Sequence, residues 1–147
     1  MATSRRARVV WQGDLASGSG RVSAATSGAF TDLPVTWASR TEAAEGRTSP
    51  EELIAAAHAA CYSMALSSEL AKAGTPSTQL EVSATVTFDR VNGQWSVASS
   101  ELQVTARVPG ISEEAFQAIA AAAKDGCPVS RALHGNVEIS LAATLAR

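Results

Sequence analysis

Apolar and polar positions alternate strictly in two parts of this chain, and a period of two predicts strands with one buried face. The apolar members of the two runs are Leu80, Val82, Ala84, Val86 and Phe88, and Val137, Ile139, Leu141, Ala143 and Leu145. Asn92-Gly93 follows the first run and predicts a tight hairpin turn, with a return strand that begins at Trp95. The apolar phase of the return strand then shifts, which predicts one extra residue, a β-bulge, near Ser99–Glu101.

A long helix is predicted between the N-terminal third of the chain and this hairpin. Ser49 at the N-cap, Pro50 at the first helical position and Glu52 at the third form a capping-box signature. The pattern runs to Lys72, before the stop signal at Gly74, and predicts a helix on the order of 35 Å long. Small or apolar residues occupy nearly every face of its first half, which is typical of a helix buried all round. A chain of 147 residues has little material to bury such a helix alone, which predicts a partner subunit.

The remaining segments complete an α+β domain. Strands are predicted at 7–12, 21–24 and 33–39, with a polar loop at 41–48, and helices at 113–126 and 128–133. The predicted order is βββ-α-ββ-αα-β, with largely antiparallel sheets around a long buried central helix. We expect residues 1–147 to form a single domain.

Composition and charge exclude several classes of function. The net charge of −2 provides no basic surface for nucleic acid or for an anionic membrane. No apolar stretch predicts a membrane span, and no apolar segment follows the N-terminal arginines as a signal peptide requires. We therefore expect a cytoplasmic protein that binds neither nucleic acid nor membrane and keeps its thiols reduced.

The chain has two cysteines, and their positions predict different chemistry. Cys127 lies between Gly126 and Pro128, at the N-cap of the short helix, where backbone N–H groups lower the pKa of a thiol. Cys61 lies in the middle of the long helix, where burial raises the pKa. Each cysteine alone is also compatible with inert packing. Candidate cations or bases for Cys61 are His58, one turn before it, and Arg21, Arg40, Arg47 and Arg131.

The residues alone do not decide the role of Glu51 or whether the histidines and cysteines bind zinc. Glu51 lies ~15 Å along the helix from Cys61, so it either caps the helix or reaches the Cys61 of a second, antiparallel helix. His58, Cys61, Cys127 and His134 together offer two nitrogen and two sulfur ligands for zinc. However, six residues separate the last cysteine and histidine, more than in common zinc motifs.

Two motifs resemble those of the OsmC/Ohr family. Residues Thr48–Leu66 are similar to the first cysteine motif of that family, and residues Gly126–Ser130 are similar to the second. Residues Trp11–Leu15 and Val108–Ile111 resemble the OsmC branch in particular. Both motifs are long, occur in the family order and are separated by the family spacing, so the resemblance spans nearly the whole chain.

The resemblance implies a thiol peroxidase that reduces organic hydroperoxides without metal, haem, flavin or other cofactor. It implies that Cys61 attacks the peroxide, that Cys127 resolves the resulting sulfenic acid as a disulfide, and that Arg40 and Glu51 assist. Arg21 is the alternative arginine. It also implies the OsmC-like fold, an intertwined homodimer, and recycling by an external dithiol of the lipoyl or thioredoxin-like kind. The alternatives are a zinc or small-ligand binding module and a redox sensor that reacts once without turnover.

Overall fold

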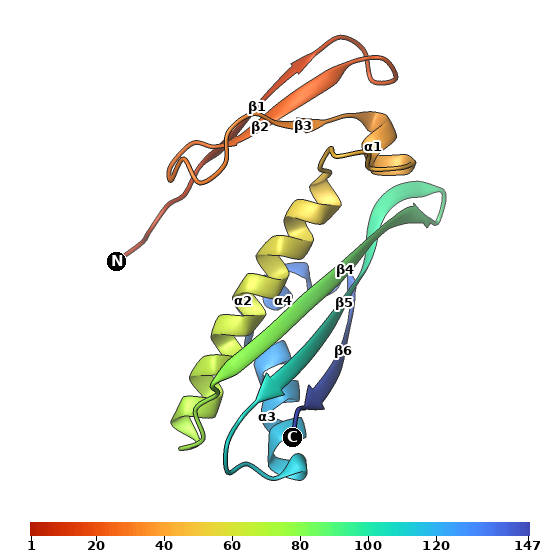
Figure 1. Ribbon diagram of the computed structural model, residues 1–147. Coiled ribbons are helices and arrows are strands. Elements are labelled where there is room, and N and C mark those ends of the chain that lie inside the picture. The colour runs from red at the N-terminus through yellow and green to blue at the C-terminus, as the bar shows by residue number, and fades with distance from the viewer. The chain divides into compact units, whose positions relative to one another are not determined.

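The computed structural model describes residues 1–147, which divide into two compact units, Met1–Leu53 and Ile54–Arg147 (Figure 1). The boundary falls inside the long helix α2. The elements in chain order are β1 (Ala7–Gln12), β2 (Ser19–Ala24), β3 (Leu33–Val35), α1 (Trp37–Thr41), α2 (Pro50–Lys72), β4 (Gln79–Val91), β5 (Gln94–Arg107), α3 (Glu113–Gly126), α4 (Pro128–Leu133) and β6 (Glu138–Leu145). No helix among them is long and apolar enough to cross a bilayer.

The N-terminal unit is built on the three-stranded sheet β1-β2-β3, in which both pairings are antiparallel. The strand predicted at 33–39 is too long, because β3 ends at Val35 and α1 begins at Trp37. The reason is a capping box: Ser39 N–H donates to Thr36 Oγ1, and Thr36 N–H donates to Ser39 Oγ. These reciprocal hydrogen bonds satisfy two backbone donors that a strand would need to pair elsewhere.

Helix α2 begins and ends where the sequence predicts. Ser49 Oγ accepts a hydrogen bond from Glu52 N–H at 3.1 Å, which is half of the expected capping box. The Glu52 carboxylate instead accepts from Thr48 Oγ1 at 2.8 Å. At the other end, Gly74 has a φ of 81°, a left-handed conformation that terminates helices and that glycine adopts without strain.

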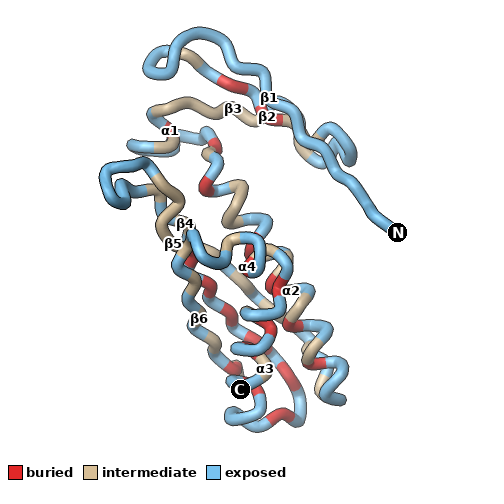
Figure 2. Tube along the Cα trace, turned by 180° about the vertical axis from the view of Figure 1, so that it is seen from behind, coloured by how far each residue is buried: buried red, intermediate tan, exposed pale blue.

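The expectation that α2 is buried all round is not met within one chain. Its fully buried side chains in the C-terminal unit form a single stripe, with a residue at every fourth position: His58, Tyr62, Leu66 and Leu70. Figure 2 shows this stripe as red bands that alternate with exposed segments along the helix. The opposite face is open, and Met64 on it is 72% exposed. One chain therefore covers only one side of its longest helix.

The C-terminal unit is built on the sheet β4-β5-β6, with β5 in the centre. β4 and β5 form the predicted hairpin, in which Asn92 and Gly93 have positive φ values of 51° and 81°. The bulge is present slightly before its predicted position. Thr87 pairs with Ser99 and Phe88 pairs with Val97, so the extra residue is the alanine between Val97 and Ser99. This insertion turns the even positions of β5 toward the core.

One strand pairing departs from the antiparallel expectation. Three of the four pairings are antiparallel, whereas β6 runs parallel to β5. The cause is the long connection through α3 and α4, because a helical crossover returns the chain to the same end of the sheet before the next strand begins. The predicted order of elements is otherwise observed, with the short α1 added.

The core of the C-terminal unit lies on one face of this sheet. β5 alternates between buried and exposed residues from Ser100 to Arg107, and β4 and β6 alternate in the same way. Helices α2 and α3 both contribute side chains to the core on the buried face. Tyr62 Oη on α2 also donates to the Ala120 carbonyl on α3 at 3.0 Å. This packing fixes α2 and α3 against the sheet and positions the segment between α3 and α4.

Candidate active site

The fold brings Cys61 and Cys127 together, although they are far apart in sequence. Cys61 lies on α2 and is partly exposed, whereas Cys127 lies between α3 and α4 and is fully buried. Both are free thiols, and they lie close enough for each to shift the pKa of the other. The backbone N–H of Val129, in the first turn of α4, interacts with both sulfurs. The two cysteines that the sequence singles out are therefore neighbours in the C-terminal unit.

The surroundings shift the two thiols in opposite directions. Burial raises the pKa of Cys61, and the neighbouring Cys127 raises it further, while the Val129 N–H partly opposes them. Burial also raises the pKa of Cys127, but the nearby Ser130 N–H, Cys61 thiol, Ser130 hydroxyl and Val129 N–H outweigh this effect, so the net pKa is lowered. Cys127 occupies the N-cap position of α4 as predicted, without a side-chain capping bond of standard geometry. The raised pKa of Cys61 and the lowered pKa of Cys127 both agree with the sequence prediction.

The N-terminal unit contains the second predicted pair, Arg40 and Glu51. Arg40 Nε lies 3.0 and 3.1 Å from the two Glu51 carboxylate oxygens, and Arg40 Nη2 lies 2.8 Å from Oε1. The Glu51 side chain is 8% exposed and that of Arg40 is 27% exposed. The Arg40 guanidinium also lies 5.9 Å from the centre of the Trp37 ring. A planar guanidinium held by two nitrogens in this way has a fixed orientation.

The other candidate arginines have different neighbours. Arg21 Nη1 donates a long hydrogen bond of 3.5 Å to the Asp32 carbonyl. Arg47 lies 3.8 Å from the exposed Glu45 carboxylate. Of the two arginines considered for the pair with Glu51, the structure brings Arg40 to it. The Arg40–Glu51 pair belongs to the N-terminal unit and the cysteine pair to the C-terminal unit.

A buried histidine cluster next to the cysteines was not predicted. His58 Nδ1 lies 2.7 Å from Ser100 Oγ, and His58 Nε2 lies 2.8 Å from Ser130 Oγ. All three residues are buried, and burial lowers the pKa of His58. The signal in the sequence was Ser100, a polar residue at an even position of β5, in phase with the buried Leu102. A polar side chain at a core position needs a hydrogen-bond partner.

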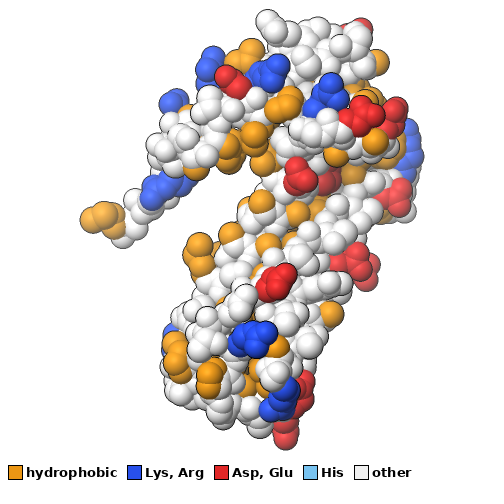
Figure 3. All heavy atoms as spheres, in the orientation of Figure 1, with side chains coloured by type: hydrophobic (Ala, Val, Ile, Leu, Met, Phe, Trp, Pro, Cys, Tyr) orange, Lys and Arg blue, Asp and Glu red, His pale blue; other side chains and the backbone are white.

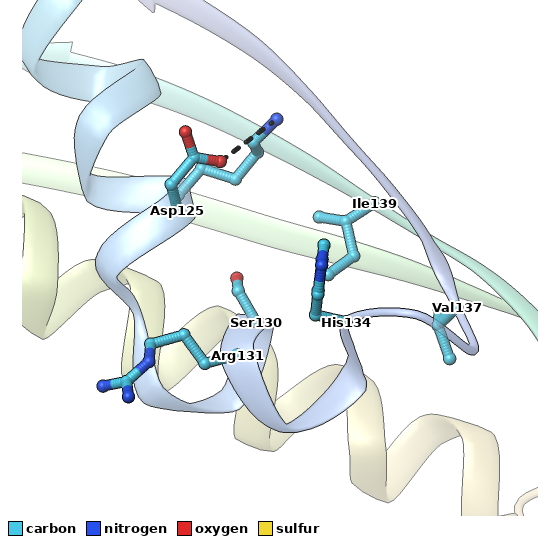
Figure 4. A pocket seen from close by; sticks show the side chains of 7 residues that line it. Asp125, Ser130, Arg131, His134, Val137 and Ile139 are labelled. Atoms are coloured by element: carbon cyan, nitrogen blue, oxygen red, sulfur yellow. Dashed lines mark ion pairs between the residues drawn. The ribbon is translucent and has the colours of Figure 1, made fainter.

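A solvent-open cavity of about 540 Å³ lies beside this cluster and is lined from α3, α4 and β6 (Figure 4). Ser130 and Arg131 line it from α4, His134 from the residue after α4, and Ile139 from β6. Lys124 and Asp125 on its rim form an ion pair at 3.8 Å. Neither cysteine lines this cavity, so it reaches the histidine cluster through Ser130 and not the thiols directly.

The geometry disfavours the zinc alternative. Both ring nitrogens of His58 are already hydrogen-bonded to serine hydroxyls, so neither is free to bind a metal. His134 is exposed and lines the neighbouring cavity. No three histidine, cysteine, aspartate or glutamate side chains are grouped as a metal site would require.

Comparisons with known proteins identify the family of this chain. Residues 43–142 match the family of OsmC-like proteins. The chain is 39% identical over 139 residues to peroxiredoxin OsmC of Escherichia coli (strain K12), which covers 95% of this chain and 96% of that protein. It is 30% identical over 112 residues to the organic hydroperoxide resistance protein OhrA of Bacillus subtilis (strain 168), covering 75% and 77% of the two chains.

A solved structure of similar fold is that of the organic hydroperoxide resistance protein OhrB of Bacillus subtilis. It superposes with a TM-score of 0.68 at 26% identity and covers 96% of this chain and 98% of that chain. The family match spans more than half of this chain, and the OsmC relative matches almost all of it. This protein is therefore a member of the OsmC-like family, with the α+β fold of the OsmC and Ohr proteins.

Proposed function

We propose that this protein is a cysteine-based peroxidase that reduces organic hydroperoxides to alcohols. The observation that carries the proposal is the pair of free, neighbouring thiols of Cys61 and Cys127. One of them is partly exposed and the other is fully buried. The names of the relatives, a peroxiredoxin and organic hydroperoxide resistance proteins, support the same reaction class.

The exposure of the two thiols supports the roles that we propose for them. Cys61 is accessible to a peroxide, so its thiolate attacks the distal oxygen, the O–O bond breaks, and the alkoxide leaves and takes up a proton to become the alcohol. Cys61 is then a sulfenic acid. The Cys127 thiolate attacks this sulfur, which forms a disulfide and releases hydroxide, and the hydroxide is protonated to water. An external dithiol of the lipoyl or thioredoxin-like kind restores both thiols and is itself oxidised.

The Cys61 thiolate needs a positive charge that its own unit does not supply. The groups that act on the Cys61 pKa there are the burial of its thiol, Cys127 and the Val129 N–H, and none is a cation. Arg40, held by Glu51, is the cation that we assign to this role. Because Glu51 lies ~15 Å along α2 from Cys61, we propose that the Arg40–Glu51 pair acts on the Cys61 of a second subunit.

The proposed assembly is an intertwined homodimer in which both units of the chain form one functional domain. The open face of α2 supports this assembly. Figure 3 shows apolar side chains along the α2 side of the C-terminal unit, and Met64 there is largely exposed. A second copy of α2 would cover this face. The apolar surroundings of Cys61 favour alkyl and fatty-acid hydroperoxides over hydrogen peroxide.

The test is consumption of cumene hydroperoxide with excess dithiol by the wild type, Cys61→Ser, Cys127→Ser and Arg40→Met. We expect many turnovers for the wild type and none for Cys61→Ser. Arg40→Met removes the guanidinium that we assign to the Cys61 thiolate, and this variant should lower kcat/KM by about ten- to a hundredfold. If the wild type consumes no more than one equivalent per subunit, the peroxidase proposal fails, and a stoichiometric redox sensor becomes the better interpretation.

A further inference from the structure

A series of buried polar side chains leads from the centre of the sheet toward the cysteine pair. It begins at Ser100 on β5, passes through both ring nitrogens of His58, and continues to Ser130 at distances of 2.7 and 2.8 Å. The Ser130 hydroxyl and the Cys61 thiol both lower the pKa of Cys127, which places them beside its sulfur. His58, Ser100 and Cys127 are completely buried, and Ser130 is 4% exposed. All five residues belong to the C-terminal unit.

The direction of these hydrogen bonds depends on the tautomer of His58. Burial lowers the pKa of this histidine, so the ring is neutral at pH 7, with one nitrogen donating and the other accepting. If Nε2 carried no hydrogen, it would accept the Ser130 hydroxyl proton, and that proton would point away from Cys127. If Nε2 carries the hydrogen, it donates to Ser130 Oγ. The Ser130 hydroxyl is then free to donate to the Cys127 sulfur, and Nδ1 accepts from Ser100.

We propose that Ser130 and His58 are positioning residues for Cys127. Ser100 fixes the His58 tautomer, His58 Nε2–H orients the Ser130 hydroxyl, and that hydroxyl donates to the Cys127 thiolate. This rests on the proposed function, because its consequence is that Cys127 is ready as a thiolate when Cys61 becomes a sulfenic acid. A fast second step then limits further oxidation of Cys61 to forms that dithiols do not reduce.

The polar residues of this cluster occupy positions where apolar side chains would be expected. Ser100 occupies a position of β5 whose neighbours in the same phase, Leu102 and Val104, are apolar core residues. His58 heads the buried stripe of α2, whose other members are Tyr62, Leu66 and Leu70. Apolar side chains at these positions would fill the core without the desolvation of polar groups. The cluster instead retains polar side chains whose hydrogen bonds are all satisfied.

The direct test measures the thiol pKa of Cys127 without any peroxidase reaction. In a Cys61→Ser background, the rate of alkylation of Cys127 by iodoacetamide is measured as a function of pH, with and without Ser130→Ala. Because the fold buries this thiol, thiolate absorbance in the ultraviolet provides a parallel titration. We expect Ser130→Ala to raise the apparent pKa of Cys127 by about one unit, a tenfold loss of thiolate near neutral pH.

A matched control is Ser63→Ala. Ser63 lies on the same helix as His58, but its hydroxyl donates to the Ala59 carbonyl at 2.7 Å and is not part of the cluster. We expect its removal to leave the titration of Cys127 unchanged. His58→Gln keeps an N–H donor for Ser130 and should retain most of the effect, whereas His58→Leu should resemble Ser130→Ala. An unchanged Cys127 pKa in Ser130→Ala would overturn the proposal, even if the leucine variant does not fold.

A second readout separates this proposal from the proposed function. In protein that keeps Cys61 and Cys127, single-turnover experiments with cumene hydroperoxide resolve sulfenic acid formation from disulfide formation. We expect Ser130→Ala to slow disulfide formation by about tenfold and to leave the first step within about twofold. If the Cys127 pKa shifts but the wild type does not turn over hydroperoxide, the proposed function fails and the positioning role stands. If the wild type turns over and neither quantity shifts, the positioning role fails.

Discussion

The two units of the chain differ sharply in how they bury their apolar side chains. In the C-terminal unit, thirteen buried residues from α2, α3, β5, β6 and the adjoining loops form one core cluster. In the N-terminal unit, Val22 is the one buried apolar side chain, and every residue of β1 is exposed. The large apolar side chains left exposed there include Val9, Val10 and Trp11. Figure 2 shows this contrast as red bands in one unit and mostly pale blue in the other.

The two units therefore differ in whether each contains its own core and which site residues it carries. The C-terminal unit contains its own core and the complete cysteine pair. The N-terminal unit holds a well-oriented arginine–glutamate pair on a sheet with little core of its own. It would gain stability if its exposed apolar side chains packed against further surface. An N-terminal unit that docks on a second subunit would satisfy this need and would bring Arg40 to the Cys61 that lacks a cation.

The largest expected effect comes from breaking the stronger core. Phe116 is fully buried on α3, so Phe116→Ala should lower the free energy of unfolding by about 3–5 kcal/mol. Val22→Ala, in the N-terminal unit, should lower it by only about 1–2 kcal/mol. Chemical denaturation followed by circular dichroism measures both values. Equal losses for the two variants would contradict the contrast between the units.

A charge on the open face of α2 should break the proposed dimer. Met64→Glu places a carboxylate where a second α2 is expected to pack, and it should raise the dimer Kd by about tenfold or more. Sedimentation analysis over a range of protein concentrations measures this Kd. Ala118→Glu, which adds the same charge to an exposed position of α3, is the control and should leave the Kd unchanged. A monomeric wild type would refute the proposed assembly.

The smallest expected effect is a dependence of stability on pH that originates in the C-terminal core. The pKa of His58 is lowered by burial, so the folded state favours its neutral form. The stabilisation that neutral His58 provides is fully present above the pKa of the unfolded state, about 6.5. As the pH falls below that value, the free energy of unfolding decreases by up to about 1.4 kcal/mol per pH unit. The groups hydrogen-bonded to its ring are the Ser100 and Ser130 hydroxyls, which do not titrate in this range.

The chain offers a matched control because it has two histidines. Denaturation midpoints measured between about pH 5 and 7 should show a weaker acid dependence for His58→Gln than for the wild type. His134→Gln should retain the wild-type dependence, since His134 is exposed. The same pH dependence for all three proteins would mean that other groups control acid stability.

Much of the fold could be predicted because local signals and burial agreed. The alternation from Leu80 to Phe88, the Asn92-Gly93 turn and the cap at Ser112 each correspond to an element of the structure. The two wrong predictions, the direction of β6 and the length of β3, depend on interactions that the alternation pattern does not show. The direction of β6 depends on the crossover through α3 and α4, and the shortness of β3 depends on a capping box that competes with strand formation.

The candidate site was predictable in part. The cysteines and the Arg40–Glu51 pair were identified from their motifs, and the structure brings the members of each pair into contact. The roles of Ser100 and Ser130 were not predicted, because serine is common in sequences and its partner His58 lies 42 and 72 residues away in the chain. Only the fold shows that these hydroxyls meet one histidine.

The central claim is that Cys61 attacks the peroxide and Cys127 resolves the product. Its most direct test is peptide mass spectrometry after one equivalent of cumene hydroperoxide, with dimedone present to trap sulfenic acid. We predict a Cys61–Cys127 disulfide in the wild type, a dimedone adduct on Cys61 in Cys127→Ser, and no adduct in Cys61→Ser. A dimedone adduct on Cys127 in Cys61→Ser, formed as fast as that on Cys61, would contradict the account and reverse the two roles.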